Sequence, residues 1–288
     1  MKNISTHIRL SLFIFLTPVL LWLVLLIVIP HVELLIMSLR GTSDMGNPTW
    51  TLENYRHFFT ERIYWYTFVR TACYAVITTI LTFVVTFPVA FYLTKVVNLR
   101  YKGFFIVLLL MPFWVSELVR VYGWMILLRE SGVINHFLVQ LHLINEPIEM
   151  LYNDASMLMG MVYTSMLFMA VPLISALEDM DDAMIEAAHD LGASAPTIFF
   201  KVVIPYAAPG ITSGSIVVFM LALGNYLTPT LMGGKNSLWF TEQIYNEFIA
   251  SFNWNQGAAF GFLLLLLSSV IIWVALKLTR QDLGRALS

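Results

Sequence analysis

The sequence has little charge and a single cysteine. Only 12% of its 288 residues are charged and 59% are hydrophobic, whereas an average soluble domain carries about 25% charged residues. Its 16 basic and 18 acidic residues leave a net charge of -2, and this balance provides no basic field for nucleic acid. We therefore expect a protein that is surrounded by lipid and has no nucleic-acid partner.

The sequence patterns of common enzymes and metal sites are also missing. The lone Cys73 excludes an intrachain disulfide and a CxxC motif, and we expect it in a core or against lipid. The chain contains no GxSxG, HExxH or paired intramembrane aspartates, and His136 and His142 stand six residues apart in a loop. A GxxxxGK[ST] phosphate-binding loop is absent as well. We expect no catalytic residue, no metal ligand and no cofactor on this chain, which is therefore not an enzyme.

Six apolar segments are long enough to cross a bilayer, which takes about 20 residues of helix. They cover approximately residues 10–30, 70–94, 104–128, 157–177, 210–231 and 258–276. Backbone groups in lipid must be satisfied within the protein, and continuous apolar runs such as residues 263–267 exclude the alternating strands of a membrane β-barrel. The sequence therefore predicts an all-α membrane protein of about six transmembrane helices.

The six segments are expected to form one domain. The first follows Lys2 and Arg9 like a secretion signal, but its roughly 21 apolar residues and the lack of an evident cleavage site favour a retained helix. No repeat or linker divides the chain, so we expect a single transmembrane domain over residues 1–288. Residues 131–153 carry an amphipathic pattern that predicts a short helix on the outer surface.

Basic residues gather at the amino end, in the second loop and at the carboxyl end. They are Lys2, Arg9, Lys95, Arg100, Lys102, Lys277, Arg280 and Arg285. Because basic loops tend to stay inside, both termini and the second loop are expected in the cytoplasm. The fourth loop, about residues 178–209, is then cytoplasmic by parity, although six acids precede its only cation, Lys201. Four tryptophans predict an aromatic belt at the outer interface, namely Trp50, Trp65, Trp239 and Trp254.

The fourth loop predicts two short helices joined by a turn. Ala187 and Ala188 supply little side-chain bulk on the first helix, so another surface can approach its backbone closely. The residues suited to the ends are Asp181 or Asp182 as the first cap, Gly192 as the left-handed end, Ser194 as the second cap and Pro205 as the limit of the second helix.

The same loop carries a spaced motif. It reads Glu-Ala-Ala, three residues, Gly and nine residues, followed by Val-Val-Ile-Pro at residues 202–205. Val202 and Ile204 replace the Ile and Leu of an Ile-x-Leu-Pro ending, while Glu186, Gly192 and Pro205 stand at its spacing. This pattern resembles the EAA motif of permease subunits in type I ABC importers.

The resemblance implies a coupling helix that sits in a cleft of a separate cytoplasmic ATPase and transmits its closing motion. ATP and Mg would bind to that ATPase. The residues expected to make the contact are Glu186, Ala187, Ala188, His189, Asp190 and Gly192. Many family members carry Arg where this chain has His189, which either alters one ATPase contact or is simply solvated. The family further implies a bacterial inner (plasma) membrane, an external or periplasmic binding protein, and a second permease subunit that is identical or homologous.

Three stretches are similar to spermidine/putrescine permeases. Pro-Phe-Trp at residues 112–114 and Arg-Val-Tyr-Gly-Trp at 120–124 lie in the third segment, and Thr-Pro-Thr-Leu-Met-Gly-Gly at 228–234 follows the fifth. Residues 51–55 are also similar but recur more broadly among such permeases. Thr230 departs from the many polyamine members that have an acid at this point. The resemblance implies a polyamine or related small organic cation as substrate, with an opine or another zwitterion as the alternative.

The third segment has ionisable residues near mid-membrane, where such groups are costly and normally face a cavity or a partner. Glu117 and Arg120 stand three residues apart and can pair on one helix face, either for the substrate or as a structural lock. Nearby aromatic residues either offer faces to a cation or pack in a core. The predicted substrate pathway comprises Glu117, Trp114, Arg120, Tyr122, Trp124, Asn225 and Tyr226.

Two further features concern the helices themselves. Four prolines fall within predicted spans and either interrupt them to line a pathway or form packed kinks. They are Pro88, Pro112, Pro172 and Pro229. Gly210-x-x-x-Gly214 and Gly257-x-x-x-Gly261 give the fifth and sixth segments faces suited to close packing, although such pairs are common by chance.

Two other classes of function compete with this one, a self-contained secondary transporter or channel and an intramembrane enzyme. Secondary transporters usually contain inverted repeats, and none is evident here. The catalytic patterns are absent, as described above. Six spans without a repeat correspond to half of a pathway, so we expect alternating access between this chain and a second permease.

Overall fold

A computed structural model describes residues 15–42 and 48–279. Four of the basic residues from which the cytoplasmic ends were predicted, Lys2, Arg9, Arg280 and Arg285, lie outside the described residues. The chain divides into two compact units, one within Met1–Trp65 and Gln243–Leu266 and the other within Tyr66–Glu242 and Leu267–Ser288. A single transmembrane domain over residues 1–288 stays a prediction.

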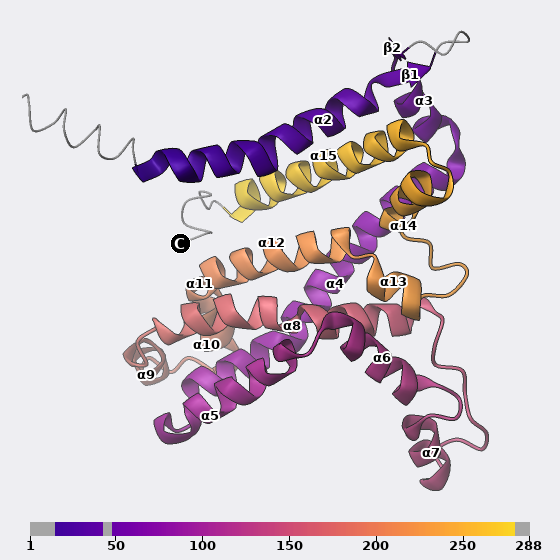
Figure 1. Cartoon of the computed structure of the whole chain (residues 1–288). Helices are drawn as coiled ribbons and strands as arrows, with labels where there is room; N and C mark the ends of the chain where they lie inside the picture. The colour runs from indigo at the N-terminus through magenta and orange to yellow at the C-terminus, as the bar shows by residue number, and fades with distance from the viewer. Residues whose placement is uncertain (1–14, 43–47, 280–288) are drawn as a thin grey trace, which may run out of the picture. The chain divides into compact units, whose positions relative to one another are not determined.

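The described elements are almost all helical (Figure 1). In chain order they are η1 (Val24–Val28), α2 (Ile29–Ser38), β1 (Arg40–Thr42), β2 (Pro48–Trp50), α3 (Glu53–Thr60), α4 (Arg62–Lys95), α5 (Leu99–Leu110), η2 (Met111–Trp114), α6 (Glu117–Leu128), α7 (Val133–Gln140), α8 (Asp154–Glu178), α9 (Ala183–Asp190), α10 (Ala195–Ile198), η3 (Phe199–Val203), α11 (Ile204–Tyr206), α12 (Ala208–Gly224), α13 (Leu227–Met232), α14 (Phe240–Tyr245), η4 (Asn246–Ala250) and α15 (Trp254–Thr279). The short helix α7 lies where the amphipathic pattern of residues 131–153 predicted one.

Four helices are long and apolar enough to cross a membrane, and two bent pairs raise the number to as many as six. The four are Phe15–Ser38, Arg62–Lys95, Asp154–Glu178 and Trp254–Lys277. The first continues past its predicted end at residue 30, and Pro30 follows the π-helical turn η1 within it. The second begins eight residues before residue 70. Tyr64 packs on Phe260 with ring centroids 4.6 Å apart and donates to Glu247 at 3.1 Å, and these contacts order its first turns.

The predicted third span, residues 104–128, is not one helix. Residues Leu99–Trp114 and Glu117–Gln140 are bent by 92° relative to each other. Pro112 has no N–H to donate, and the chain passes through the 3-10 turn η2 into an extended Val115. Ser116 then begins α6 by accepting a hydrogen bond from the Val119 N–H at 3.4 Å. The span is thus interrupted at Pro112, which is one of the two alternatives expected for that proline.

The predicted fifth span, residues 210–231, is also broken. Helix α12 ends at Gly224, Asn225 is extended, and α13 begins at Leu227. The Asn225 side-chain oxygen accepts from the Thr228 N–H at 3.0 Å and so caps the new helix. The second coupling-loop helix likewise runs beyond Pro205 to Tyr206 before a 68° bend into α12.

Proline alone does not determine where these helices break. Pro88 and Pro172 lie inside α4 and α8, which continue on both sides of them. Pro229 lies within α13, four residues after the break at Asn225. Only Pro112 stands in the irregular turn itself.

Helices α8 and α12 pack side by side in the second unit (Figure 1). A Cβ added to Gly210 would come within 2.5 Å of the Pro172 carbonyl oxygen, and one added to Gly214 within 2.9 Å of Met169 Sδ. The predicted close-packed face therefore exists, and small residues let the two backbones approach. Residues of α4 complete this core, among them Phe87, Ala90 and Leu93.

A two-stranded antiparallel ladder was not predicted. Arg40 pairs with Trp50 and Gly41 with Thr49. The Asn54 side chain donates to the carbonyls of Ser38 and Arg40 at 2.8 and 2.9 Å, while its own carbonyl accepts from Gln256 at 2.8 Å. Asn54, within residues 51–55, thus joins the hairpin to the start of α15.

Three of the four tryptophans assigned to the outer belt are exposed. Trp50, Trp65 and Trp254 are 71%, 42% and 56% exposed, and their place at the outer interface stays a prediction. Trp239 is fully buried, so its assignment to the belt was wrong. Its ring lies edge-on to Tyr74, with centroids 6.3 Å apart.

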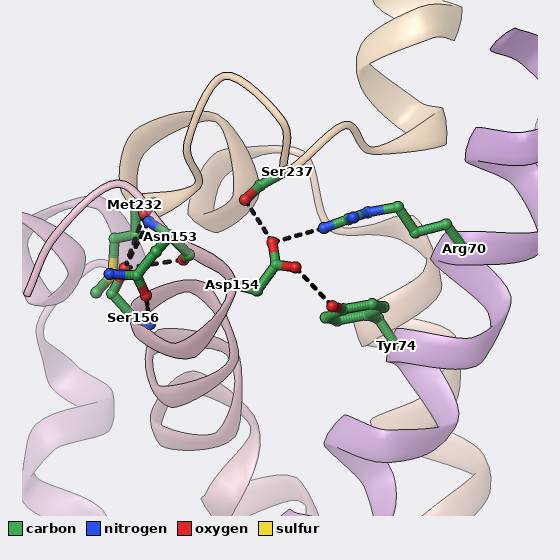
Figure 2. Close-up of polar contacts among 7 residues, drawn as sticks. All are labelled: Arg70, Tyr74, Asn153, Asp154, Ser156, Met232 and Ser237. Carbon is green, nitrogen blue, oxygen red and sulfur yellow. Dashed lines mark hydrogen bonds and ion pairs between the residues drawn. The ribbon is translucent and has the colours of Figure 1, made fainter.

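Asp154, the first residue of α8, gathers three side chains (Figure 2). It pairs with Arg70 at 2.6 Å and accepts hydrogen bonds from Tyr74 at 2.6 Å and Ser237 at 2.5 Å. Arg70 and Tyr74 belong to α4, and Ser237 to the segment between α13 and α14. One carboxylate therefore fixes this segment to two helices, a link that the sequence did not predict.

Candidate functional site

Helix α9 (Ala183–Asp190) of the fourth loop has well-defined ends. The Asp181 side chain accepts from the Ala183 N–H at 3.0 Å, so Asp181 caps the helix. Gly192 adopts φ +76°, as predicted, and its N–H bonds to the His189 carbonyl at 2.9 Å. The Ala193 N–H reaches the Ala188 carbonyl at 3.1 Å, which completes a Schellman ending. An added Cβ at Gly192 would meet no atom within 4 Å, so backbone conformation alone requires glycine there.

Two expected caps take other partners. Asp182 stands at the capping position of α9, but its side chain makes no hydrogen bond to the helix and pairs with Lys95 instead. Ser194 precedes α10, yet its hydroxyl lies 2.9 Å from that of Thr197 and does not cap the backbone. The prediction of Asp181 or Asp182 as the first cap is therefore confirmed at Asp181, whereas the predicted cap at Ser194 was wrong.

The two faces of α9 have different surroundings. Ile185 and Ala188 pack against the buried cluster formed by α4 and α8. The other predicted contact residues are exposed, namely Glu186, Ala187, His189, Asp190 and Gly192. Met184 and Leu191 are 42% and 89% exposed beside Ala187, and they were not predicted. Their spacing of three and four residues from Ala187 was the available signal, since such residues share a helix face.

Two lysines attach the fourth loop to the preceding one. Lys95, at the end of α4, pairs with Asp182 at 2.7 Å, and Lys102 of α5 pairs with Glu178 at 2.8 Å. The Tyr206 hydroxyl also donates to the Asp179 carbonyl at 2.8 Å. These contacts place the second and fourth loops on the same side of the membrane. They also give a reason for the acidic residues of the fourth loop, since two of them neutralise basic residues of the second.

The break before α6 in the predicted third span meets the break at Asn225 in the predicted fifth span. The Asn225 amide donates to Glu117 Oε1 at 2.9 Å, and the Thr228 hydroxyl donates to the same oxygen at 3.3 Å. Glu117 is the first residue of α6, and Asn225 joins α12 to α13. Discontinuous helices often form substrate sites in transporters because their free backbone and polar ends face a cavity.

A cavity of about 480 Å³ opens at this junction. We name it the polar cavity. Its lining residues are Phe113, Glu117, Arg120, Thr164, Ser165, Phe168, Leu221, Gly224, Asn225, Tyr226 and Leu227. Four of the predicted pathway residues, Glu117, Arg120, Asn225 and Tyr226, are thus brought together.

Glu117 and Arg120 form no ion pair in the part of the chain that the structure describes, so their predicted pairing was wrong. Glu117 is instead held by the two donors of the fifth span. The Arg120 guanidinium lies 5.7 Å from the centroid of the Phe113 ring, and its buried Nε has no hydrogen-bond partner in the described part of the chain. The polar cavity therefore contains one fixed carboxylate and one cation that is not neutralised within residues 15–42 and 48–279.

The other three predicted pathway residues do not line the polar cavity. Trp114 and Tyr122 are 79% and 45% exposed, and Trp124 packs edge-on against Tyr163 with centroids 5.5 Å apart. Tyr122 follows Arg120 by two residues, which places it on another face of α6. Across the described ranges, no three His, Cys, Asp or Glu side chains are grouped so as to hold a metal ion.

Comparison with known proteins gives consistent matches. The family model described as the binding-protein-dependent transport system inner membrane component matches residues 76–281. The spermidine/putrescine transport system permease protein PotB of Haemophilus influenzae is 32% identical over 258 residues, covering 88% of each chain. PotB of Escherichia coli K12 is 31% identical over 261 residues, covering 90% of this chain and 94% of the relative.

A solved structure has the same fold. It is a bacterial alginate ABC transporter in complex with an alginate pentasaccharide-bound periplasmic protein, and one of its chains matches with a TM-score of 0.75 at 15% identity. The match covers 98% of this chain and 99% of that chain. Together with the family model and the relatives, it shows that the chain belongs to the inner membrane components of binding-protein-dependent transport systems and is a permease subunit of an ABC importer.

Proposed function

We propose that the chain forms half of the translocation pathway of a polyamine importer and receives its energy from an ATPase that docks on α9. The observation that carries the docking is the exposed face of α9, where Glu186 and Ala187 stand in the motif and Met184 and Leu191 flank them. Apolar side chains there can enter a cleft while Glu186 contacts a basic residue. ATP and Mg bind to the ATPase, since this sequence contains no phosphate-binding loop.

The same proposal sets the orientation. If α9 meets a cytoplasmic ATPase, the ends of α4 and α8 that carry Lys95 and Glu178 lie on the cytoplasmic side. Six spans then place both termini in the cytoplasm. The segment held by Asp154 faces outward, toward a periplasmic binding protein. A homologous second permease supplies the other half of the pathway.

The substrate class is supported by the PotB relatives and by the polar cavity. Glu117 Oε1 takes both hydrogen bonds from the fifth span, and Oε2 accepts none in the described structure. That oxygen is available to an ammonium group, and the rings of Phe113, Phe168 and Tyr226 line the same space. A polyamine needs both features, carboxylates for its charges and apolar or aromatic walls for its methylenes.

A second candidate substrate is favoured by Arg120. Its guanidinium lines the polar cavity without an ion partner among the described residues, and it would repel a ligand that carries only positive charge. A zwitterion such as an opine would place its ammonium at Glu117 and its carboxylate at Arg120. The PotB relatives support a polyamine, whereas the position of Arg120 in the polar cavity supports a zwitterion.

The test is uptake into proteoliposomes that contain this chain, its second permease, the ATPase and the binding protein. We expect ATP-dependent uptake of spermidine or putrescine by the complete complex, and none by this chain alone. Uptake by the chain alone, without ATP, would overturn the proposal in favour of a secondary transporter. Uptake of an amino carboxylate that is lost in Arg120→Gln, with no uptake of polyamines, would establish the second candidate.

A further inference from the structure

Lys95 is the last residue of α4, and its side chain is only 7% exposed. Its ammonium donates to the main-chain carbonyl of Met180 and to Asp182 Oδ1, the latter at 2.7 Å. A lysine ammonium has three donors and loses hydration when it is buried, so these oxygens replace part of its water shell. The contact is therefore a specific attachment of α4 rather than a solvated surface charge.

Both acceptors lie directly before the coupling helix. Met180 is 2% exposed, and Asp182 immediately precedes Ala183, the first residue of α9. Helix α9 has eight residues, and a helix of that length has little stability of its own in water. Its position therefore depends on tertiary contacts, which include the inward packing of Ile185 and Ala188 and the attachment at Lys95.

We propose that Lys95 is a positioning residue of the transport cycle. It holds the amino-terminal end of α9 on the end of α4, so that movement of an ATPase against α9 is passed to the α4 span. This inference rests on the proposed docking of α9 on an ATPase and adds to it the span that receives the movement. The motif could not reveal Lys95, which lies 87 positions before Asp182.

Lys102 offers a matched control. It lies on the same side of the membrane, its side chain is 18% exposed, and it pairs with Glu178 at 2.8 Å. Glu178 is the last residue of α8 and precedes the segment that leads into α9. Lys102→Met thus removes an ion pair of the same kind without touching the attachment of α9.

The experiment uses the complete reconstituted complex, with spermidine as the transported probe, and measures uptake per ATP hydrolysed. Lys95→Met keeps the apolar stem and removes the ammonium. We expect normal copurification of the ATPase, continued ATP hydrolysis, and uptake per ATP lowered at least about fivefold, the lower end of typical coupling between sites. Lys95→Arg should restore the ratio to within about twofold of wild type, and Lys102→Met should stay within the same range.

An unchanged ratio in Lys95→Met, or an equal loss in Lys95→Met and Lys102→Met, overturns the proposal. If Lys95→Met does not assemble, Asp182→Asn decides, because it leaves the contact of Lys95 with Met180 in place. A lowered ratio in an assembled Asp182→Asn complex supports the proposal, and a wild-type ratio overturns it. The underlying proposal that the ATPase docks on α9 is tested separately. It would be contradicted if the Glu186→Ala and Gly192→Val complexes bound the ATPase normally.

Discussion

The hydrogen bonds that stabilise the coupling helix join residues close together in the sequence, whereas those that stabilise the polar cavity join residues far apart. Helix α9 is closed by bonds such as that from the Ala193 N–H to the Ala188 carbonyl, five residues away. The polar cavity is closed by the bond from Asn225 to Glu117, 108 residues away. A substitution in the loop should therefore alter one element, whereas a substitution at either break should alter two. The following predictions test that contrast, beginning with the largest expected effect.

Gly192→Val should have the largest effect on coupling. A β-branched residue held at φ +76° costs about 1–3 kcal/mol of backbone strain, so the end of α9 should be displaced. We expect ATPase copurification and ATP-dependent uptake to fall at least about tenfold, while the membrane helices stay intact. Gly103→Val is the matched control, because an added Cβ there meets no atom within 4 Å and its φ is ordinary. Normal uptake and ATP hydrolysis in Gly192→Val would refute the role of this turn.

Glu117→Gln should reduce transport without affecting assembly. The glutamine oxygen still accepts from Asn225 and Thr228, so the two breaks should remain joined while the charge is lost. We expect spermidine uptake to fall about tenfold, as for loss of a hydrogen bond to a charged group. Glu130→Gln makes the same chemical change at an exposed position and should leave uptake unchanged. Disassembly of the Glu117→Gln complex would show instead that Glu117 is structural.

Glu186→Ala should have a smaller effect than Gly192→Val, because it removes one exposed contact and leaves the helix in place. Exposed ion pairs are typically weak, and we expect ATPase-coupled uptake to fall about two- to fivefold. Glu186→Gln, which retains a hydrogen-bond acceptor, should lie between Glu186→Ala and wild type. The measurement is substrate-stimulated ATP hydrolysis by the reconstituted complex. An effect as large as that of Gly192→Val would mean that the loop and its turn do not act separately.

Tyr226→Leu and Trp114→Leu should show whether a ring that lines the polar cavity affects spermidine affinity more than a ring outside it. Tyr226 lines the cavity, whereas Trp114 is 79% exposed. A cation held by an aromatic face gains about 0.5–1 kcal/mol, so Tyr226→Leu should weaken the apparent affinity for spermidine about two- to fivefold. Trp114→Leu should change it less, as measured by the concentration dependence of uptake. The opposite order would place the pathway elsewhere.

The same contrast explains what could be predicted from the sequence. Asp181 and Gly192 carry local signals, a side-chain oxygen and a missing Cβ, that determine the ends of α9 whatever the rest of the chain does. Residues such as Glu117 and Asn225 were suspected because they are polar among apolar neighbours. Their direct contact could not be read from either segment, since it requires both breaks. Lys95 was noted only as a basic loop residue, because its partner lies in another loop.

The breaks themselves were hard to predict for a physical reason. A lipid environment demands apolar residues on both sides of a break, so residues 104–128 and 210–231 each read as one largely apolar segment despite the polar Ser116, Glu117 and Asn225. Proline was an ambiguous signal, since Pro88 and Pro172 are accommodated within continuous helices. Trp239 was placed at the interface by type, although its ring is buried against Tyr74. In each case the surroundings, rather than the residue, decided the outcome.

The continuity of α4 has a mechanical consequence. At about 1.5 Å per residue, roughly 38 Å of helix separates Lys95 from Arg70. Lys95 contacts the approach to α9, while Arg70 and Tyr74 contact the carboxylate that also binds Ser237. Because α4 is continuous, a displacement of Lys95 along the helix axis also displaces Arg70. A displacement of α5, by contrast, can be taken up at the break between α5 and α6. Helix α4 thus links the approach to the coupling helix with the segment that Asp154 holds.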